Sequence, residues 1–268
     1  MYVSGTTACG KSDLAMMHAE ELIKEGVKVI VFDATLDWVK LSSLPYYLTV
    51  REGEHFQYSF DIGSFIFDMS LLNITQQKKL VRIVCRELWK RQVRDAQQGK
   101  PLRQYYLIFE EGHNYFPQGC MRSHELADVV QLVTGGRNYK IRFEVITQFA
   151  SMIDKDVMKY MKQRYFGYSD EPNDIDYITG FLGREHSKKL TELKAGQFLY
   201  KFGKKVRQIK NPIYESKTKS KPYPKLLEEP EPKEDRPETD LLKFAAVVFQ
   251  VGALLIFLFA LAVTLSGW

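Results

Sequence analysis

The feature that most constrains the fold lies near the start of the sequence. Residues 5–12 read GTTACGKS, a match to the pattern G-x-x-x-x-G-K-[ST]. A short apolar segment, 2–4, precedes this motif, and a helical pattern over 11–25 follows it. A chance match in a glycine-rich loop would lack this strand-and-helix setting. The sequence therefore predicts a phosphate-binding loop between the first strand and the first helix of an α/β sheet.

Each residue type in this loop has a physical role. Glycines let backbone N–H groups curve around phosphate oxygens, and the helix N-terminus adds the positive end of its dipole. We expect Lys11 to reach the β- and γ-phosphates of ATP, and Ser12 to ligate Mg²⁺. The predicted nucleotide-binding residues are Gly5, Thr6, Thr7, Ala8, Cys9, Gly10, Lys11 and Ser12.

The rest of residues 1–200 alternates between strand and helix patterns. Apolar runs at 27–32, 105–109 and 142–147 predict buried strands, and periodic segments predict helices over about 75–98, 123–133 and 154–163. Short apolar runs separated by helices are typical of a doubly wound, mostly parallel sheet. Two segments that flank Gly203, 197–202 and 205–209, predict an antiparallel hairpin at the sheet edge.

Two acids follow the predicted strand at 105–109. Glu110 and Glu111 would lie at the carboxyl-terminal edge of the sheet, beside the phosphate-binding loop. There Glu110 can hold the Mg²⁺ shell through water, and Glu111 can polarise the attacking water. Aspartate is the commoner first acid in such a pair, so the two roles can be exchanged. A pair of surface acids after a buried strand is the alternative interpretation.

Two more side chains are candidates for the reaction. Gln148 follows the strand at 142–147, so its amide can hydrogen-bond the γ-phosphate or the attacking water at the same edge. An ordinary polar residue at a strand end is the alternative. Arg137 lies at a helix-to-strand turn, where it can act as an arginine finger on a neighbouring subunit or form a surface ion pair.

Positive charge is concentrated after residue 200. The formal net charge is +5, yet residues 1–200 hold 26 basic and 25 acidic residues. Residues 201–225 hold nine basic residues and one acid, whereas 226–240 hold seven acids and two basic residues. Half of the ten prolines lie between Pro222 and Pro237. Charged, proline-rich sequence buries little apolar surface, so we expect an extended linker over 217–240.

A long apolar segment follows this linker. Residues 244–265 are 22 residues without a charge, enough for a helix to cross a hydrocarbon core about 30 Å thick. A buried core helix is the alternative, but a linker precedes the segment and three residues follow it. The expected organisation is a nucleotide-binding domain over 1–210, a basic-then-acidic linker over 211–240 and a single transmembrane tail anchor over 241–268. Because Lys and Arg lie on its N-terminal side, we predict a cytoplasmic domain with the C-terminus across the membrane.

The cysteines and histidines give little support to metal or disulfide chemistry. Cys9, Cys85 and Cys120 form neither a CxxC motif nor a set with a nearby His pair, so we expect no disulfide framework and no structural zinc site. His113 and His124 also lack the spacing of metal ligands and are interpreted as structural. This cysteine usage is typical of a reducing compartment.

Four segments carry a family resemblance: the phosphate-binding loop, LIFEEGHNYFP (107–117), LVTGGRNYKIRFEVITQ (132–148) and LKAGQFLYKFGKKVRQIK (193–210). The second and third are more specific than the loop. Together the four segments resemble the FtsK/HerA superfamily of ring-forming, DNA-pumping ATPases. The resemblance implies a RecA-like P-loop NTPase core, a ring that is usually a hexamer, ATP hydrolysis between subunits, and DNA in the pore. The segment TQFASMID (147–154) and the membrane span are also similar to the Zot-like assembly ATPases of filamentous phages. Asp33 and the sequence GGRNY favour the first family.

These observations predict a membrane-anchored, Mg²⁺-dependent ATPase that couples hydrolysis to DNA translocation, in viral genome packaging or DNA transfer. A Zot-like motor for virion assembly or secretion is the alternative, and a nucleotide-gated binding module with little turnover is a third hypothesis. Basic residues in 201–225 can bind DNA phosphates or anionic lipid headgroups. A basic stripe on the helix predicted at 75–98 is a second candidate DNA contact, although a solvated helix face explains it somewhat better; it comprises Lys78, Arg82, Arg86, Lys90 and Arg94.

Overall fold

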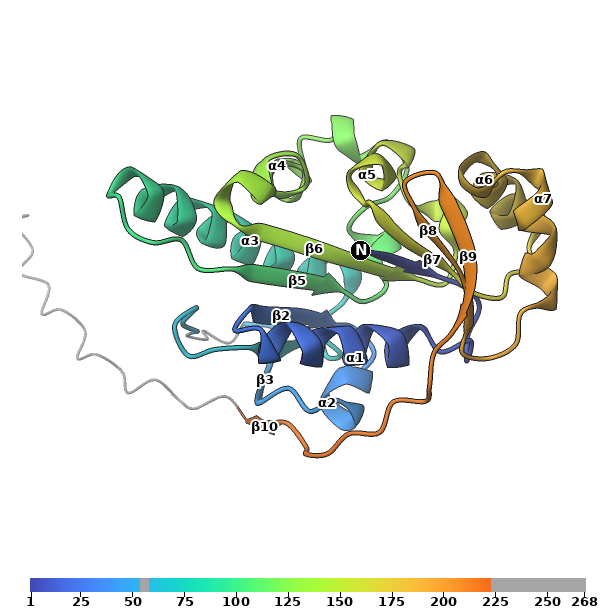
Figure 1. The fold of residues 1–268 in the computed structure, drawn as a ribbon. Coiled ribbons are helices and arrows are strands. Elements are labelled where there is room, and N and C mark those ends of the chain that lie inside the picture. The colour runs from blue at the N-terminus through green and yellow to red at the C-terminus, as the bar shows by residue number, and fades with distance from the viewer. Residues whose placement is uncertain (54–57, 223–268) are drawn as a thin grey trace, which may run out of the picture. The chain divides into compact units, whose positions relative to one another are not determined.

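The computed structural model describes residues 1–53 and 58–222. The membrane span predicted within 241–268 and most of the predicted acidic linker lie outside these described residues. Within the described part of the chain, no helix is both long and apolar enough to cross a membrane. Helices cover both faces of one sheet, with α1 and α2 on one side and α3, α4 and α5 on the other (Figure 1).

The sheet has ten strands in the order β10-β3-β4-β2-β5-β6-β1-β7-β8-β9. Neighbouring strands from β10 to β7 pair in parallel, whereas β7–β8 and β8–β9 pair antiparallel. The predicted mostly parallel sheet and its edge hairpin are therefore confirmed. The strands are β1 (Tyr2–Ser4), β2 (Lys28–Asp33), β3 (Tyr46–Thr49), β4 (Phe65–Asp68), β5 (Tyr105–Phe109), β6 (Ile141–Thr147), β7 (Gln163–Phe166), β8 (Gln197–Phe202), β9 (Lys205–Lys210) and β10 (Lys221–Pro222).

Capping residues explain where the longest helix begins and ends. The longest, α3, starts with a capping box in which Asn73 Oδ1 accepts the Gln76 N–H at 3.0 Å and Gln76 Oε1 accepts the Asn73 N–H at 2.9 Å. It ends before Gly99, which adopts a positive φ of 66°. The helices are α1 (Lys11–Lys24), α2 (Asp37–Leu41), α3 (Ile74–Gln97), α4 (Ala127–Gly135), α5 (Lys155–Tyr160), α6 (Pro172–Leu182) and α7 (Arg184–Ser187).

Both faces of the central strands are buried, which explains why these strands read as continuous apolar runs. On one face, Phe32 stacks on Phe67 and on Phe109, with ring centroids 5.7 and 5.0 Å apart. On the other face, Val31 and Ile108 lie in one apolar cluster with small residues of α1. The central strands therefore fix where their carboxyl-terminal ends lie, and those ends form the candidate site.

Several elements were not predicted from the sequence: α2, β3, β4, β7 and α6. The helix expected over 154–163 ends at Tyr160, because Gln163 already begins β7. Arg164 of β7 donates from its guanidinium to the Met158 carbonyl at 2.7 Å, and the strand pairs with β1. The polar sequence QRYF carries no apolar run, so this strand depends on its neighbours in the sheet.

After β9 the chain crosses the sheet on the α1 and α2 side and reaches β10 at the opposite edge (Figure 1). Tyr214 holds this crossing segment, residues 211–222, against α1. Its N–H donates to Asp13 Oδ1 at 3.2 Å and its hydroxyl donates to Glu20 Oε1 at 2.7 Å. These contacts, and the pairing of β10 with β3, attach residues 211–222 to the sheet.

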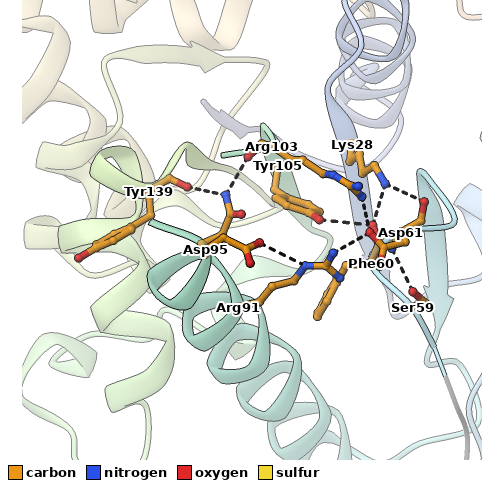
Figure 2. Close-up of polar contacts among 10 residues, drawn as sticks. Lys28, Ser59, Phe60, Asp61, Arg91, Asp95, Arg103, Tyr105 and Tyr139 are labelled. Carbon is orange, nitrogen blue, oxygen red and sulfur yellow. Dashed lines mark hydrogen bonds and ion pairs between the residues drawn. The ribbon is translucent and has the colours of Figure 1, made fainter. Parts of the chain in front are cut away.

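A cluster of charges lies at the amino-terminal edge of the sheet and is drawn in Figure 2; we call Lys28, Asp61, Arg91 and Arg103 the Asp61 cluster. Arg91 contacts Asp61 Oδ1 at 2.6 Å, and Arg103 contacts the same oxygen. Lys28 Nζ donates to the carbonyls of Phe60 and Asp61, each at 2.8 Å. These contacts fasten the loop before β4 to β2, α3 and the start of β5.

Candidate nucleotide-binding site

The candidate site lies at the carboxyl-terminal edge of the sheet. Strands β5, β6 and β1 are adjacent and parallel, so the residues that follow them emerge side by side. The phosphate-binding loop follows β1, Glu110 and Glu111 follow β5, and Gln148 follows β6. The predicted loop, acids and amide are thus brought together by strand order.

The loop conformation suits the role that its sequence predicts. Gly5 and Gly10 have φ values of 148° and 92°, where a side chain causes strain, and an added Cβ on Gly5 would lie 2.7 Å from Cys9 Sγ. Lys11 is 8% exposed, and its ammonium donates to the Thr6 carbonyl at 3.0 Å, so the charge lies over the loop. The first N–H groups of α1, including that of Ser12, have no intrahelical acceptor and are donors for an anion.

Two segments outside the phosphate-binding loop form hydrogen bonds with its backbone. The Thr6 N–H donates to the Tyr168 carbonyl at 2.9 Å, and the Gly196 N–H donates to the Cys9 carbonyl at 2.9 Å. Cys9 is buried, and burial raises the pKa of its thiol. Its side chain therefore packs inside the loop rather than acting as a nucleophile.

A chain of hydrogen bonds joins the loop to one of the two acids. Thr7 Oγ1 donates to Gln148 Oε1 at 3.4 Å, and Gln148 Nε2 donates to Glu111 Oε1 at 3.0 Å. Glu111 has a left-handed φ of 49°, an uncommon conformation for a residue with a side chain. His113 Nδ1 lies 3.3 Å from Glu111 Oε2, which gives this histidine an orienting contact that its sequence spacing did not reveal.

Glu110 has a very different environment. Its side chain is 5% exposed, and its Oε2 accepts a hydrogen bond from Trp38 Nε1 at 2.8 Å. Burial raises the pKa of the Glu110 carboxyl to about 8, although the Trp38 hydrogen bond lowers it and the charge of Asp33 raises it further. A carboxyl with this pKa is mostly protonated at neutral pH, and a bound cation would favour its ionised form.

The contacts around Glu110 were not predicted from the sequence. Asp33, at the end of β2, is fully buried and accepts hydrogen bonds from the N–H groups of Thr35, Trp38 and Val39. Burial raises the pKa of Asp33 to about 6. The sequence shows Asp33 at the end of a predicted strand. It does not show the contact between Asp33 and α2, because α2 was not predicted.

The protein atoms at this edge fit Mg²⁺ bound together with a nucleotide. Among the described residues, no group of three or more His, Cys, Asp or Glu side chains could hold a metal ion without further ligands. Mg²⁺ usually takes one or two protein oxygens and completes its shell with phosphates and water. The Ser12 hydroxyl and the buried Glu110 carboxyl supply oxygens of this kind, and the Lys11 charge lies close enough to lower the Glu110 pKa.

The structure does not bring Arg137 to this site. Arg137 precedes β6, so it lies at the amino-terminal edge of the sheet, away from the loop. There it lines a cavity of about 660 Å³ together with Arg142, Lys159, Tyr160, Lys162 and Phe202 among others. Within one chain, Arg137 therefore has no contact with the predicted phosphates, and a role on a neighbouring subunit stays a prediction.

A phosphate-binding loop after the first strand, acids after one neighbouring strand and a polar amide after another define the fold of a P-loop NTPase with a RecA-like core. No protein-family model matches the sequence, and a search of curated proteins also finds no match. Comparison with solved structures does find matches.

B204, the genome packaging NTPase of Sulfolobus turreted icosahedral virus 2, has a TM-score of 0.58 at 17% identity, over 80% of this chain and 96% of B204. VirB4 of Thermoanaerobacter pseudethanolicus has a TM-score of 0.58 at 11% identity, over 79% of this chain and 88% of VirB4. The pCW3 conjugation coupling protein TcpA has a TM-score of 0.51 at 17% identity, over 80% of this chain and 60% of TcpA. These likenesses confirm the predicted mostly parallel α/β fold of the P-loop NTPase core.

Proposed function

We propose that the chain is a Mg²⁺-dependent ATPase. The observation that carries this proposal is the hydrogen-bonded chain from Thr7 through Gln148 to Glu111, which links the phosphate-binding loop to a carboxylate. Such a link places a base and a polar amide where an attacking water meets a γ-phosphate. B204, which shares the fold, has been solved with ATPγS and with AMPPCP.

Each residue has a separable part in this reaction. The loop N–H groups and Lys11 bind the phosphates and stabilise the charge that develops on them. Ser12 and Glu110 would hold Mg²⁺, which neutralises phosphate charge when it is bound. Glu111 polarises the attacking water, and Gln148 orients both the water and the Glu111 carboxylate.

We propose further that hydrolysis drives DNA translocation by a ring of these subunits, in genome packaging or DNA transfer. The fold is shared with proteins described as a genome packaging NTPase and a conjugation coupling protein. The β8–β9 hairpin supplies a basic surface of matching charge, on which the Arg207 guanidinium lies 5.0 Å from the Tyr200 ring centroid. Its other cations are Lys201, Lys204, Lys205 and Lys210. A hexamer is the ring that the sequence resemblance implies.

The membrane anchor stays part of this proposal on the strength of the sequence. The 22 uncharged residues at 244–265 support a single-pass tail anchor with the ATPase domain in the cytoplasm. Deletion of 241–268 should release the protein from membranes and leave ATP turnover unchanged, because the predicted linker separates the anchor from the domain. Turnover lost together with membrane attachment would contradict this separation.

ATP turnover of the full chain, with and without double-stranded DNA, tests the translocation proposal. We expect DNA to raise turnover, and log affinity for DNA to fall with log salt by about 0.9 per phosphate neutralised. Neutralising Lys201, Lys204, Lys205 and Arg207 should weaken binding to all sequences alike and flatten this slope. Neutralising Lys78, Arg86, Lys90 and Arg94 on α3 makes the same charge change at the second candidate surface. We expect this variant to keep the slope, and a slope flattened in this variant alone would assign the DNA contact to α3 instead of the hairpin.

The alternative is a Zot-like motor that drives virion assembly or secretion without gripping DNA. The observation that favours it is TQFASMID at 147–154 followed, further along the chain, by the predicted span. An assembled protein that hydrolyses ATP but shows neither salt-sensitive DNA binding nor stimulation by DNA would favour this function. A chain that binds ATP with negligible turnover under both conditions would favour the nucleotide-gated binding module.

A further inference from the structure

Trp38 forms a buried hydrogen bond with Glu110, although it belongs to none of the sequence motifs and has no part in the proposed reaction. The residue is on the short helix α2 and is fully buried. Its indole N–H does not point at a backbone carbonyl, as that of many buried tryptophans does, but donates to Oε2 of Glu110 at 2.8 Å. The two residues are 72 positions apart in the sequence, so this contact is a product of the tertiary fold.

The helix that carries Trp38 is itself fixed by a buried acid. Asp33 Oδ2 accepts the backbone N–H groups of Trp38 and Val39, at 3.0 and 3.2 Å. Leu36, just before the helix, adopts a left-handed φ of 68°, which is uncommon for a residue with a branched side chain. A conformation of this cost persists only where surrounding contacts determine it, and here the Asp33 carboxylate supplies them.

Trp38 also packs in one apolar cluster with the helix that follows the phosphate-binding loop. The cluster includes Ala15, Met16 and Ala19 of α1, and α1 begins with Lys11 and Ser12. The fold therefore connects α1, through this cluster, to the residue that hydrogen-bonds the Glu110 carboxylate. A residue needed for packing alone could be phenylalanine, which fills similar space and has no N–H.

We propose that Trp38 is a positioning residue that sets the orientation of the Glu110 carboxylate toward nucleotide-bound Mg²⁺; this inference rests on the proposed Mg²⁺-dependent ATPase function. The indole N–H holds one carboxylate oxygen, so the other has a fixed direction. Mg²⁺ demands near-octahedral geometry, so a carboxylate that can rotate is a poorer partner for its water shell. Groups that orient metal partners in this way commonly change metal affinity by roughly 10–100-fold when removed.

The test compares Trp38→Phe with a matched control, Trp89→Phe, in the full chain. Trp89 is another tryptophan of the described residues, and it packs edge-on against Tyr139 with ring centroids 4.8 Å apart. For each protein, calorimetry gives the affinity for ATPγS with excess Mg²⁺ and with EDTA. We expect Trp38→Phe to reduce the gain in affinity from Mg²⁺ by roughly tenfold while affinity in EDTA is unchanged. Trp89→Phe should keep the full gain.

A spectroscopic readout covers the case in which Trp38→Phe fails to fold. The full chain has three tryptophans, so Trp89→Phe retains the indole signals of Trp38 and Trp268. In ¹⁵N-labelled protein, the Trp38 signal is the one of these two that shifts in Glu110→Gln. Adding Mg²⁺ to the ATPγS complex should move this signal in the wild type and not in Glu110→Gln.

Two results would overturn the positioning role. One is a folded Trp38→Phe variant in which Mg²⁺ raises ATPγS affinity as much as in the wild type. The other is a wild-type Trp38 indole signal that does not shift when Mg²⁺ is added. If wild-type protein gained no ATPγS affinity from Mg²⁺, the proposed ATPase function itself would fail, and the inference with it. The wild-type titration therefore separates the two failures.

Discussion

The carboxyl groups at the two edges of the central sheet differ in burial and in the direction of their pKa shifts. At the carboxyl-terminal edge, Asp33, Asp68 and Glu110 are buried, and burial raises the pKa of Asp33 and of Glu110. At the amino-terminal edge, Asp61 is 52% exposed, and its hydrogen bond with Arg91 lowers the pKa of its carboxyl (Figure 2). Carboxyl groups of the same chemical type are therefore shifted in opposite directions by their surroundings.

The difference follows from the architecture. In a parallel α/β sheet, helix N-termini lie beside the carboxyl ends of the strands, where their dipoles favour negative charge, and helix C-termini lie beside the opposite edge, where they favour cations. The described residues give Glu110 and Asp33 no ion pair, whereas Asp61 is paired with Arg91 and Arg103. We infer that buried and incompletely neutralised charge marks the reactive edge, and that neutralised surface charge marks a structural one.

The phosphate-binding loop acts first, because without bound nucleotide no later step can occur. Lys11→Ala should weaken ATP binding by about 100-fold or more, since each charge-assisted hydrogen bond to phosphate contributes about 1.5–3 kcal/mol. Fluorescence titration with a labelled ATP analogue measures this loss. Lys28→Ala, a lysine in the Asp61 cluster, is the control at the other edge and should bind nucleotide as the wild type does. Equal losses in both variants would break the comparison of the edges.

Arg137, at the amino-terminal edge, is either an arginine finger that acts on a neighbouring subunit or a surface residue, and one variant distinguishes the two. For an arginine finger, Arg137→Ala should lower kcat by about 10³-fold or more. Mixing Arg137→Ala subunits with Lys11→Ala subunits should restore some turnover, because heterologous interfaces then combine an intact loop with an intact arginine. Absence of rescue in assembled mixed rings would leave Arg137 a surface residue.

The two glutamates at the reactive edge should differ in effect. Glu111→Gln should keep ATP binding and lower kcat by about 10²–10⁴-fold, because it removes the group that polarises water. Glu110→Gln should mainly raise the Mg²⁺ concentration needed for half-maximal turnover. Steady-state kinetics at varied ATP and Mg²⁺ distinguish these outcomes. Normal turnover by Glu111→Gln, with loss in Glu110→Gln, would reverse the two roles.

The raised pKa of Glu110 predicts a pH dependence of stability in the nucleotide-free protein. Between the ordinary pKa of 4.5 and about 8, the folded state holds a proton that the unfolded state has released. This contribution to the free energy of unfolding is therefore complete below about pH 4.5 and is lost as pH rises toward 8. Asp33 adds a similar loss between 3.8 and about 6.

Urea unfolding of the wild type and of Glu110→Gln at several pH values measures this dependence. The difference in free energy of unfolding between the two proteins should change most between pH 5 and pH 8, with the wild type losing stability relative to the variant as pH rises. A difference that does not vary with pH would show that the Glu110 carboxyl is not buried as a neutral group.

The smallest effect is expected in the Asp61 cluster. Arg91→Ala should cost about 1 kcal/mol or less of unfolding free energy, because Asp61 is half-exposed and solvent screens the pair. Arg94→Ala, an exposed arginine on the same helix, controls for the change in helix propensity. Thermal unfolding measures both, and a loss of ATP turnover in Arg91→Ala would contradict the structural role of this edge.

How much the sequence predicted also differs between regions. The strands at 105–109 and 142–147 are buried on both faces and therefore read as apolar runs, and this pattern alone places Glu110, Glu111 and Gln148 at one edge of the sheet. Strand β7 and helix α2 lack such patterns, since QRYF is polar and α2 has five residues held by Asp33. The contact between Trp38 and Glu110 depends on β2 lying beside β5, a pairing that no local pattern encodes.

The central claim is that nucleotide and Mg²⁺ bind at the carboxyl-terminal edge of the sheet. Hydrogen exchange of backbone amides, measured with and without ATPγS and Mg²⁺, tests it most directly because both edges are observed in one experiment. The account predicts strong protection over 5–12 and protection near Glu110 and Gln148, with unchanged exchange at 58–62 beside the Asp61 cluster. Protection at 58–62 with none over 5–12 would contradict it.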